Sequence, residues 1–433
     1  MAPVGSAEYS PPILSSDEGF LDIRRRHVLF LAGFDPIDVP AQHRRIQREM
    51  AKFAKTWQLS AHVGTIEAAT NTMGERWRLS VKGPDWHTET TYEPLDWHHI
   101  VLAEMARSRI ARLFGGLVAF FDFVISGTAW RYCVATWPYA LFFLAPFFNL
   151  LLFTLGALGG GVLIAWAAGM SGAVAAVTAF VVAIILFVGL MHWPGRRWRV
   201  EQAVADWIFA RDYMYGRNEA FNALLDGFAD RLLTCVQRGD CDEVIVVGHS
   251  LGATVAVDVI ARAIERDPNL ARAGPTVCLL TIGATIPKLA LHPAARWLRS
   301  SNQRVAHHPG IAWTEYQARR DPISFYNFDP VTLKRFNPTA RGKKPRIVLV
   351  GLKDFLSPES YRRHKMNHMR LHYQFVMANE RRAIYDYFML ICGPAPFVFL
   401  SDIPRGALDV FGPDGAYRVQ PAHGTWVVGG NRA

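Results

Sequence analysis

Short apolar runs and helix-like segments alternate through the second half of the chain. A run of β-branched residues at 243–248 is followed by a segment with helical apolar spacing at 253–265, which stops at Asp267-Pro268. Further runs of the strand type lie at 276–283, 312–318 and 346–351. Strands that alternate with helices in this way favour a parallel sheet flanked by helices, so the pattern predicts an α/β fold.

The first half opens with a similar unit. Residues 27–34 (HVLFLAGF) predict a strand that ends near Gly33, and residues 37–55 predict an amphipathic helix. Two further short strands are predicted at 77–81 and 88–92, the second followed by Pro94. This half therefore looks like part of the same mostly parallel sheet.

An uncharged segment interrupts that pattern. No Asp, Glu, Lys or Arg occurs from Tyr132 to Gly195, a length that holds two bilayer crossings of about 20 residues each. We expect spans near 137–158 and 171–191, with Gly159-Gly160-Gly161 near the turn, and an interfacial segment before them. Arginines flank the segment on both sides, so both flanks should lie on the cytoplasmic side. A wholly buried soluble hairpin is the alternative.

The charge of the chain indicates its class of binding partner, and its cysteines indicate whether disulfides are expected. The net charge of +10 comes mostly from scattered arginines, without a finger, homeodomain or RNP-like pattern, which favours membrane lipids over nucleic acid as the partner. The 5 cysteines show no paired short spacing, and an odd number argues against a disulfide framework.

Ser250 lies in the pentapeptide Gly248-His249-Ser250-Leu251-Gly252, between the predicted strand and the predicted helix. A sharp strand-to-helix turn exposes a serine hydroxyl above the sheet edge, and it brings backbone so close that the residues two before and two after the serine must be small. Both of these residues are glycine. The alternative is a glycine-rich turn whose serine merely caps the helix.

The GHSLG segment and its flanks, residues 243–265, resemble the nucleophile elbow of the α/β-hydrolase superfamily, especially its lipase-like and esterase-like members. The resemblance implies a Ser-acid-His triad in that chain order. We predict no cofactor. The acid is then predicted to be Asp321, which follows the strand at 312–318, with Asp354 as the alternative and Asp329 less favoured. Asp321 could also be an Asp-Pro turn residue.

Three histidines, His364, His368 and His372, follow at four-residue intervals in a predicted helix that begins near Pro358. The resemblance implies that one of them is the base; His372 is preferred because its neighbours are apolar, and His368 is the alternative. Such spacing could also bind a metal, but no carboxylate or cysteine completes the set, so we predict no metal site. His249 points elsewhere in the family's elbow and is not proposed as the base.

The resemblance also implies an oxyanion hole formed by the backbone N–H of Leu251 and a second donor from the loop after the first strand, for which Phe34 is the candidate. No HGGG-type segment is present. The expected activity is cleavage of an apolar, lipid-like carboxylic ester by a membrane-anchored serine hydrolase with its catalytic domain on the cytoplasmic side. A catalytically inactive membrane scaffold and an acyltransferase that uses the same serine are the alternatives.

The predicted organisation has five parts. They are a flexible tail (1–26), a first part of the catalytic domain (27–110), the interfacial segment with the hairpin (111–195), the main part of the catalytic domain (196–393) and a C-terminal tail (394–433).

Overall fold

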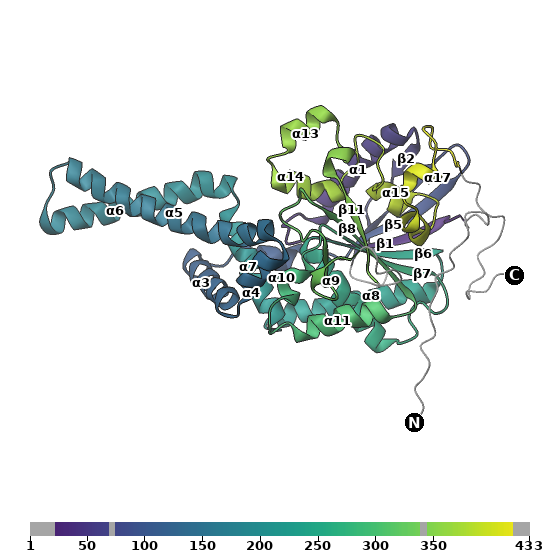
Figure 1. Ribbon diagram of the computed structural model, residues 1–433, viewed down its shortest axis with the longest axis horizontal. Helices are drawn as coiled ribbons and strands as arrows, with labels where there is room; N and C mark the ends of the chain where they lie inside the picture. Colours follow the sequence, from purple (N-terminus) through teal and green to yellow (C-terminus); the bar gives the residue numbers. More distant parts are fainter. Residues whose placement is uncertain (1–21, 69–73, 338–343, 419–433) are drawn as a thin grey trace, which may run out of the picture. The chain divides into compact units, whose positions relative to one another are not determined.

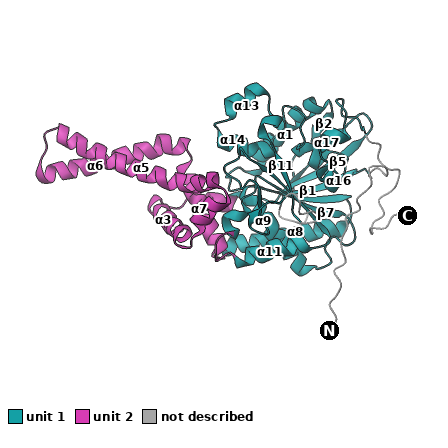
Figure 2. Ribbon diagram, viewed as in Figure 1, with its two compact units in different colours: residues 1–98, 219–290, 296–433 teal, residues 99–218, 291–295 magenta. Residues whose placement is uncertain are grey.

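The computed structural model describes residues 22–68, 74–337 and 344–418, so most of the predicted N-terminal tail and the last part of the predicted C-terminal tail, residues 419–433, lie outside the described residues. The chain divides into two compact units (Figure 2). The sheet unit comprises residues 1–98, 219–290 and 296–433, and the helical unit comprises residues 99–218 and 291–295.

The sheet unit is built on a mostly parallel sheet in the order β11-β8-β7-β6-β1-β5-β4-β2 (Figure 1). The pairs from β11 to β5 are parallel, and β4 runs antiparallel to β5, to β2 and to the short β3. The strands are β1 (Arg25–Leu31), β2 (Ser60–Val63), β3 (Glu67–Ala68), β4 (Glu75–Lys82), β5 (His87–Pro94), β6 (Glu243–His249), β7 (Thr276–Ile282), β8 (Ile311–Ala318) and β11 (Arg346–Val350), while β9 (Phe328–Asp329) and β10 (Lys334–Arg335) pair separately. The predicted α/β fold is confirmed.

Strand β6 lies in the middle of the sheet. All of its residues are buried, as expected for a central parallel strand covered on both faces. Its two neighbours are β7 and β1, and Leu31 at the end of β1 is in register with Gly248. The first part of the chain therefore contributes the strand next to the one that carries the serine motif.

Helices cover both faces of this sheet (Figure 1). The helices of the sheet unit that precede β11 are α1 (Val39–Trp57), α8 (Glu219–Arg238), α9 (Leu251–Arg266), α10 (Ile286–Ala290) and α11 (Arg296–His307). The short helices after β11 are α12 (Leu352–Phe355), α13 (Pro358–His364), α14 (His368–His372), a 3-10 turn (Tyr373–Val376), α15 (Tyr387–Cys392), α16 (Phe397–Asp402) and α17 (Ala407–Val410).

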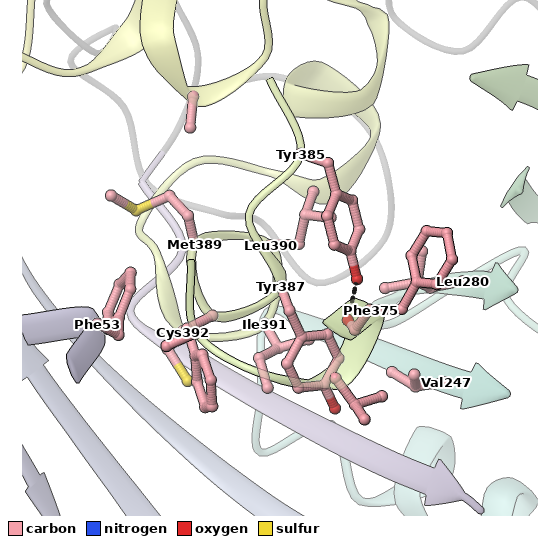
Figure 3. Packing of buried hydrophobic residues seen from close by; sticks show 14 of the residues in the cluster. Phe53, Val247, Leu280, Phe375, Tyr385, Tyr387, Met389, Leu390, Ile391 and Cys392 are labelled. Carbon is pink, nitrogen blue, oxygen red and sulfur yellow. Dashed lines mark hydrogen bonds between the residues drawn. The ribbon is translucent and has the colours of Figure 1, made fainter. Parts of the chain in front are cut away.

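One large apolar core joins α1 and the C-terminal helices to the sheet. Figure 3 shows Phe53 of α1 on the side of Met389 and Cys392 of α15, and Tyr387 of α15 on the side of Val247 of β6. The Tyr385 hydroxyl donates to the Phe375 carbonyl. Phe397 and Phe411 are buried in this core as well. The described part of the predicted C-terminal tail is therefore folded against the sheet.

The helical unit is formed by α2 (His98–Met105), α3 (Arg109–Ile125), α4 (Thr128–Ala135), α5 (Trp137–Ala167), α6 (Gly172–Leu190), a π turn (Met191–Gly195) and α7 (Val200–Met214), with α2 starting at the boundary between the units. Two segments, Trp137–Ala167 and Gly172–Gly195, are long and apolar enough to cross a membrane. They form an antiparallel hairpin (Figure 1).

The turn of this hairpin lies after Ala167, so its predicted place near Gly159-Gly160-Gly161 is wrong. The glycines are inside α5, where a Cβ on Gly161 would lie 2.2 Å from the Ala179 carbonyl oxygen of α6. Glycine is needed there because the two helix backbones approach closely, which is typical of apolar helix pairs. The first apolar helix is consequently longer than predicted.

Candidate active site

Ser250 lies at the sharp junction between β6 and α9. Its backbone has φ 58° and ψ −125°, a region that a non-glycine residue rarely adopts. A Cβ on Gly248 would lie 2.5 Å from the Ala253 Cα, and one on Gly252 would lie 2.2 Å from the Leu31 carbonyl oxygen. The two glycines are required by the same tight turn that strains the serine.

The loop after β1 passes directly over this serine. A Cβ on Gly33 would lie 2.9 Å from the Ser250 Cβ and 3.3 Å from its Oγ. The next residue along the loop is Phe34, and the residue after Ser250 is Leu251, the first residue of α9. The first N–H groups of a helix have no partner within the helix, so the Leu251 N–H is available to a negative charge near Ser250.

Asp321 and His372 form a buried pair. The Nδ1 of His372, at the end of α14, donates to Oδ2 of Asp321, in the loop after β8, over 2.8 Å. The other oxygen of Asp321 accepts from the Ile323 N–H at 3.2 Å. Both residues are almost fully buried, with Asp321 at 1% and His372 at 2% exposure, so the carboxylate holds the imidazole ring in one orientation.

This pair and Ser250 meet at the segment that follows β7. The Ser250 N–H donates to the Ile282 carbonyl at 3.1 Å, and the Thr285 N–H donates to the Ser250 carbonyl at 3.2 Å. A Cβ on Gly283 would lie 3.0 Å from His372 Cε1 and 3.3 Å from Asp321 Oδ2. Only a residue without a side chain fits between the serine backbone and the His-Asp pair, and Gly283 has φ 52°.

The remaining nitrogen of the histidine is unpaired. Among the described residues, Nε2 of His372 is buried without a hydrogen-bond partner. Ser250 is only partly buried, so its side chain is reachable from outside. An imidazole whose Nδ1 is bonded to a carboxylate and whose Nε2 is unbonded is in the tautomer that can accept a proton at Nε2.

The alternative candidates lie elsewhere. Asp354 is an exposed residue of α12, and His368 is exposed at the start of α14. The expectation of one helix through the three histidines is wrong: the chain breaks between α13 and α14, where the Asn367 side chain accepts from the Arg370 N–H. His364, His368 and His372 therefore do not share a helix face, and within the described ranges they form no group close enough to bind one metal ion.

Three further residues surround the candidate base. The ring of His249 packs on that of His372 with centroids 4.6 Å apart, and its Nε2 donates to the His372 carbonyl at 3.2 Å. Burial, together with the neighbouring His372, holds the pKa of His249 well below its usual range, so this ring is neutral. The hydroxyl of Tyr373 donates to Asp35 over 2.5 Å and thereby ties the base to the loop that follows β1.

These three contacts were missed from the sequence. The family resemblance predicts that His249 points elsewhere, yet its ring lies against that of His372. The only signal for Asp35 and Tyr373 is that each is next in sequence to a candidate residue, Phe34 and His372 respectively.

Residues 209–394 match the model of a known family, described as the alpha/beta hydrolase family. This part of the chain belongs to the alpha/beta hydrolase family. The matched range includes Ser250, Asp321 and His372. Neither the curated proteins nor the solved structures contain a significant match to the chain.

The alpha/beta hydrolase match starts after β1 and after the long apolar helices. It therefore covers the serine motif and the His-Asp pair, whereas the loop with Gly33 and Phe34 comes from outside the matched range. In the three-dimensional structure this loop still lies at the serine.

Proposed function

We propose that this protein is a membrane-anchored serine hydrolase that cleaves a carboxylic ester. The observation that carries the proposal is that Ser250 and the His372-Asp321 pair lie on either side of Gly283. Ser250 is strained and only partly buried, and the buried pair leaves His372 Nε2 without a hydrogen-bond partner among the described residues. A nucleophile, a base and a group that orients the base are the parts that acyl transfer to a serine requires.

In the proposed reaction, His372 Nε2 takes the proton of the Ser250 hydroxyl as Oγ attacks the ester carbonyl carbon. Asp321 keeps Nδ1 protonated and stabilises the imidazolium that forms. The carbonyl oxygen becomes negatively charged and accepts from the backbone N–H groups of Leu251 and Phe34. The imidazolium then protonates the leaving alcohol, and water, activated by the same histidine, releases the acid and restores the serine.

The proposed location follows from the helical unit. Helices α5 and α6 cross the bilayer, and both of their outer flanks stay on the cytoplasmic side, where arginines are enriched. A site held near a bilayer meets molecules that concentrate there, so an apolar, lipid-like ester is the proposed substrate class.

A fluorophosphonate probe tests the nucleophile directly. The Oγ of Ser250 should attack the phosphorus and release fluoride, which leaves a stable covalent adduct on the purified full-length chain in detergent micelles. Ser250→Ala should abolish the labelling, whereas Ser300→Ala, at an exposed position on α11, should leave it unchanged. Equal labelling of wild type and Ser250→Ala, with circular dichroism unchanged, would refute the proposed role of the serine.

Esters of increasing chain length then test the substrate class. We expect release of acid from apolar p-nitrophenyl esters, lost in Ser250→Ala, without any added metal ion or cofactor. Adding an alcohol separates hydrolysis from acyl transfer, because a transferase would form a new ester in place of the acid.

A further inference from the structure

Helix α3 presents an apolar stripe to the outside of the helical unit. Its members recur at helical spacing along one face, and their exposed fractions range from 40% to 83%. This outer stripe consists of Ile110, Leu113, Phe114, Leu117, Phe121, Val124 and Ile125. Apolar surface of this extent is rare on a soluble protein and marks a contact with a partner or a membrane.

The opposite face of α3 is fixed against α7. A Cβ on Gly116 would lie 2.6 Å from the Val204 Cγ1, so the two helices touch through a glycine. Farther along, Phe123 is fully buried with its ring edge-on to Trp207, the centroids being 5.1 Å apart. The outer stripe therefore cannot turn inward without the loss of this packing.

Ion pairs join the two helices near both ends of the contact. Arg112 lies 3.2 Å from Glu201, and Arg211 donates to Asp122 over 2.6 Å. Helix α7 thus has charged residues near its start and near its end, so it belongs outside the hydrocarbon layer. Since α3 is bound along α7, it stays outside as well, although α3 and α4, bent by 67°, together are long and apolar enough for one crossing.

Exposed tryptophans and arginines surround the ends of the hairpin. Trp130 and Trp137 precede or begin α5, and Trp193 and Trp198 follow α6, with exposed fractions between 55% and 81%. Tryptophan is enriched at the level of the lipid head groups, and arginine there attracts anionic lipids. Residues 196, 197 and 199 are arginines. The chain segments next to α3 therefore carry the residues of a membrane interface.

We propose that the outer stripe of α3 lies in the head-group region of the bilayer, with the helix axis parallel to the membrane surface. The proposal rests on the proposed membrane crossing by α5 and α6, and it adds a second membrane contact made by a helix that does not cross. An amphipathic helix of this kind buries its apolar face by roughly 5–10 Å. The occupant of the stripe is thus the lipid of the leaflet from which the hairpin enters.

Spin-label depth measurements test this arrangement on the full-length chain in vesicles of phosphatidylcholine and phosphatidylglycerol. Cys133 is exposed and Cys241 is partly buried, so both are first replaced by serine to keep the label off them. The other three cysteines are buried and are kept. Single cysteines are then introduced for a nitroxide by Ile110→Cys, Phe114→Cys, Leu117→Cys, Phe121→Cys and Ile125→Cys. Reference labels are placed on α5 by Leu144→Cys, Leu151→Cys and Leu158→Cys, all at exposed positions.

The depth of each label is measured from the rates at which its nitroxide collides with two reagents. Oxygen is enriched in lipid, and a nickel chelate stays in water. All five α3 labels should lie at the same shallow depth, whereas the α5 labels should differ in depth from one another. Depth that changes along α3 with a maximum near Leu117 would mean that α3 crosses the bilayer, and exclusion of both reagents would mean a protein partner; either result overturns the proposal.

Water-exposed α3 labels together with buried α5 labels also refute the lipid contact of α3 but leave the membrane anchor intact. If the α5 labels themselves are water-exposed, the anchoring part of the proposed function fails too. The two failures are therefore distinguished by the reference labels.

Discussion

The two units use apolar residues in opposite ways. In the sheet unit the large apolar side chains are inside; in the described residues, the exposed exceptions there are only Leu349, Met366 and Ile384. In the helical unit they face outward along α3, α5 and α6. The first unit buries its apolar side chains away from water, whereas the second exposes many of them on its outer surface.

Charged residues show the same contrast. The sheet unit buries complete ion pairs, such as Glu93 with Arg231, whose side chains are 1% and 5% exposed. The pairs that join α3 to α7 are more open; Glu201 is 39% exposed beside Arg112. The loss of one partner should therefore lower the free energy of unfolding more for a buried pair than for an exposed pair.

The largest expected effect is on catalysis, at the centre of the sheet unit. His372→Ala should reduce ester hydrolysis by about 10⁶-fold, because the serine loses its base. His368→Ala, on the same short helix but exposed, should change the rate by less than about twofold. Initial rates with a p-nitrophenyl ester at neutral pH measure both, and comparable losses in the two variants would contradict the assignment.

The next effect is on stability. Glu93→Gln removes the carboxylate that accepts from Arg231 at 2.5 and 2.6 Å and from His27 at 3.0 Å. Loss of one partner of a buried pair costs about 3–5 kcal/mol, so β1 and β5 should exchange their amide protons much faster. Hydrogen–deuterium exchange of peptides from these strands measures the change; unaltered protection would mean that the buried pair contributes little.

The pH dependence of that effect has a defined sign. Burial alone would raise the pKa of Glu93, but the hydrogen bonds from Arg231 and His27 outweigh it and lower the pKa from 4.5 to about 2. The stabilisation is therefore complete above pH 4.5 and is lost as the pH falls toward 2. The difference in stability between wild type and Glu93→Gln should shrink over that same range.

A smaller catalytic effect is expected at the loop after β1. Gly33→Ala places a Cβ 2.9 Å from the Ser250 Cβ and pushes the Phe34 N–H away from the reacting carbonyl. Loss of one oxyanion donor lowers kcat by about 10²–10³-fold. Gly227→Ala, in α8 with open space around it, is the matched control and should leave kcat unchanged. An equal kcat for both variants would exclude Phe34 as a donor.

The smallest effect should come from the helical unit. Glu201→Gln breaks a partly exposed pair with Arg112, and such pairs contribute at most about 1 kcal/mol. Protection of α3 against hydrogen exchange, measured in the same vesicles, should change only slightly. A loss as large as that of Glu93→Gln would show that the two units do not differ in the way that their burial indicates.

The strands, the helix after Ser250 and the two apolar helices were predictable because their signals are local. The run VIVV before GHSLG indicates a buried strand by itself, and the absence of charge between Tyr132 and Gly195 needs no long-range information. The predicted strand 243–248 corresponds to β6 with a difference of one residue. The preference for His372 over His368 stays a functional prediction, although only His372 contacts Asp321.

The other features depend on contacts between distant residues. The place of β1 between β5 and β6 is set by pairs such as Arg26 with Glu243, which no local pattern reveals. The break between α13 and α14 depends on a single cap at Asn367. Glycines 159–161 looked like a turn because a sequence does not show whether a glycine permits a bend or a close helix contact.

The position of β1 in the sheet also determines the order in which neighbouring strands become available during synthesis. A ribosome completes β1 and β5 first, then residues 99–218 of the helical unit, and only afterwards β6. Until β6 emerges, one edge of β1 has no partner, and an open apolar strand edge is a site of mispairing and aggregation. The nascent sheet is therefore half built while the long apolar helices are made, and Ser250 emerges only after both of these helices.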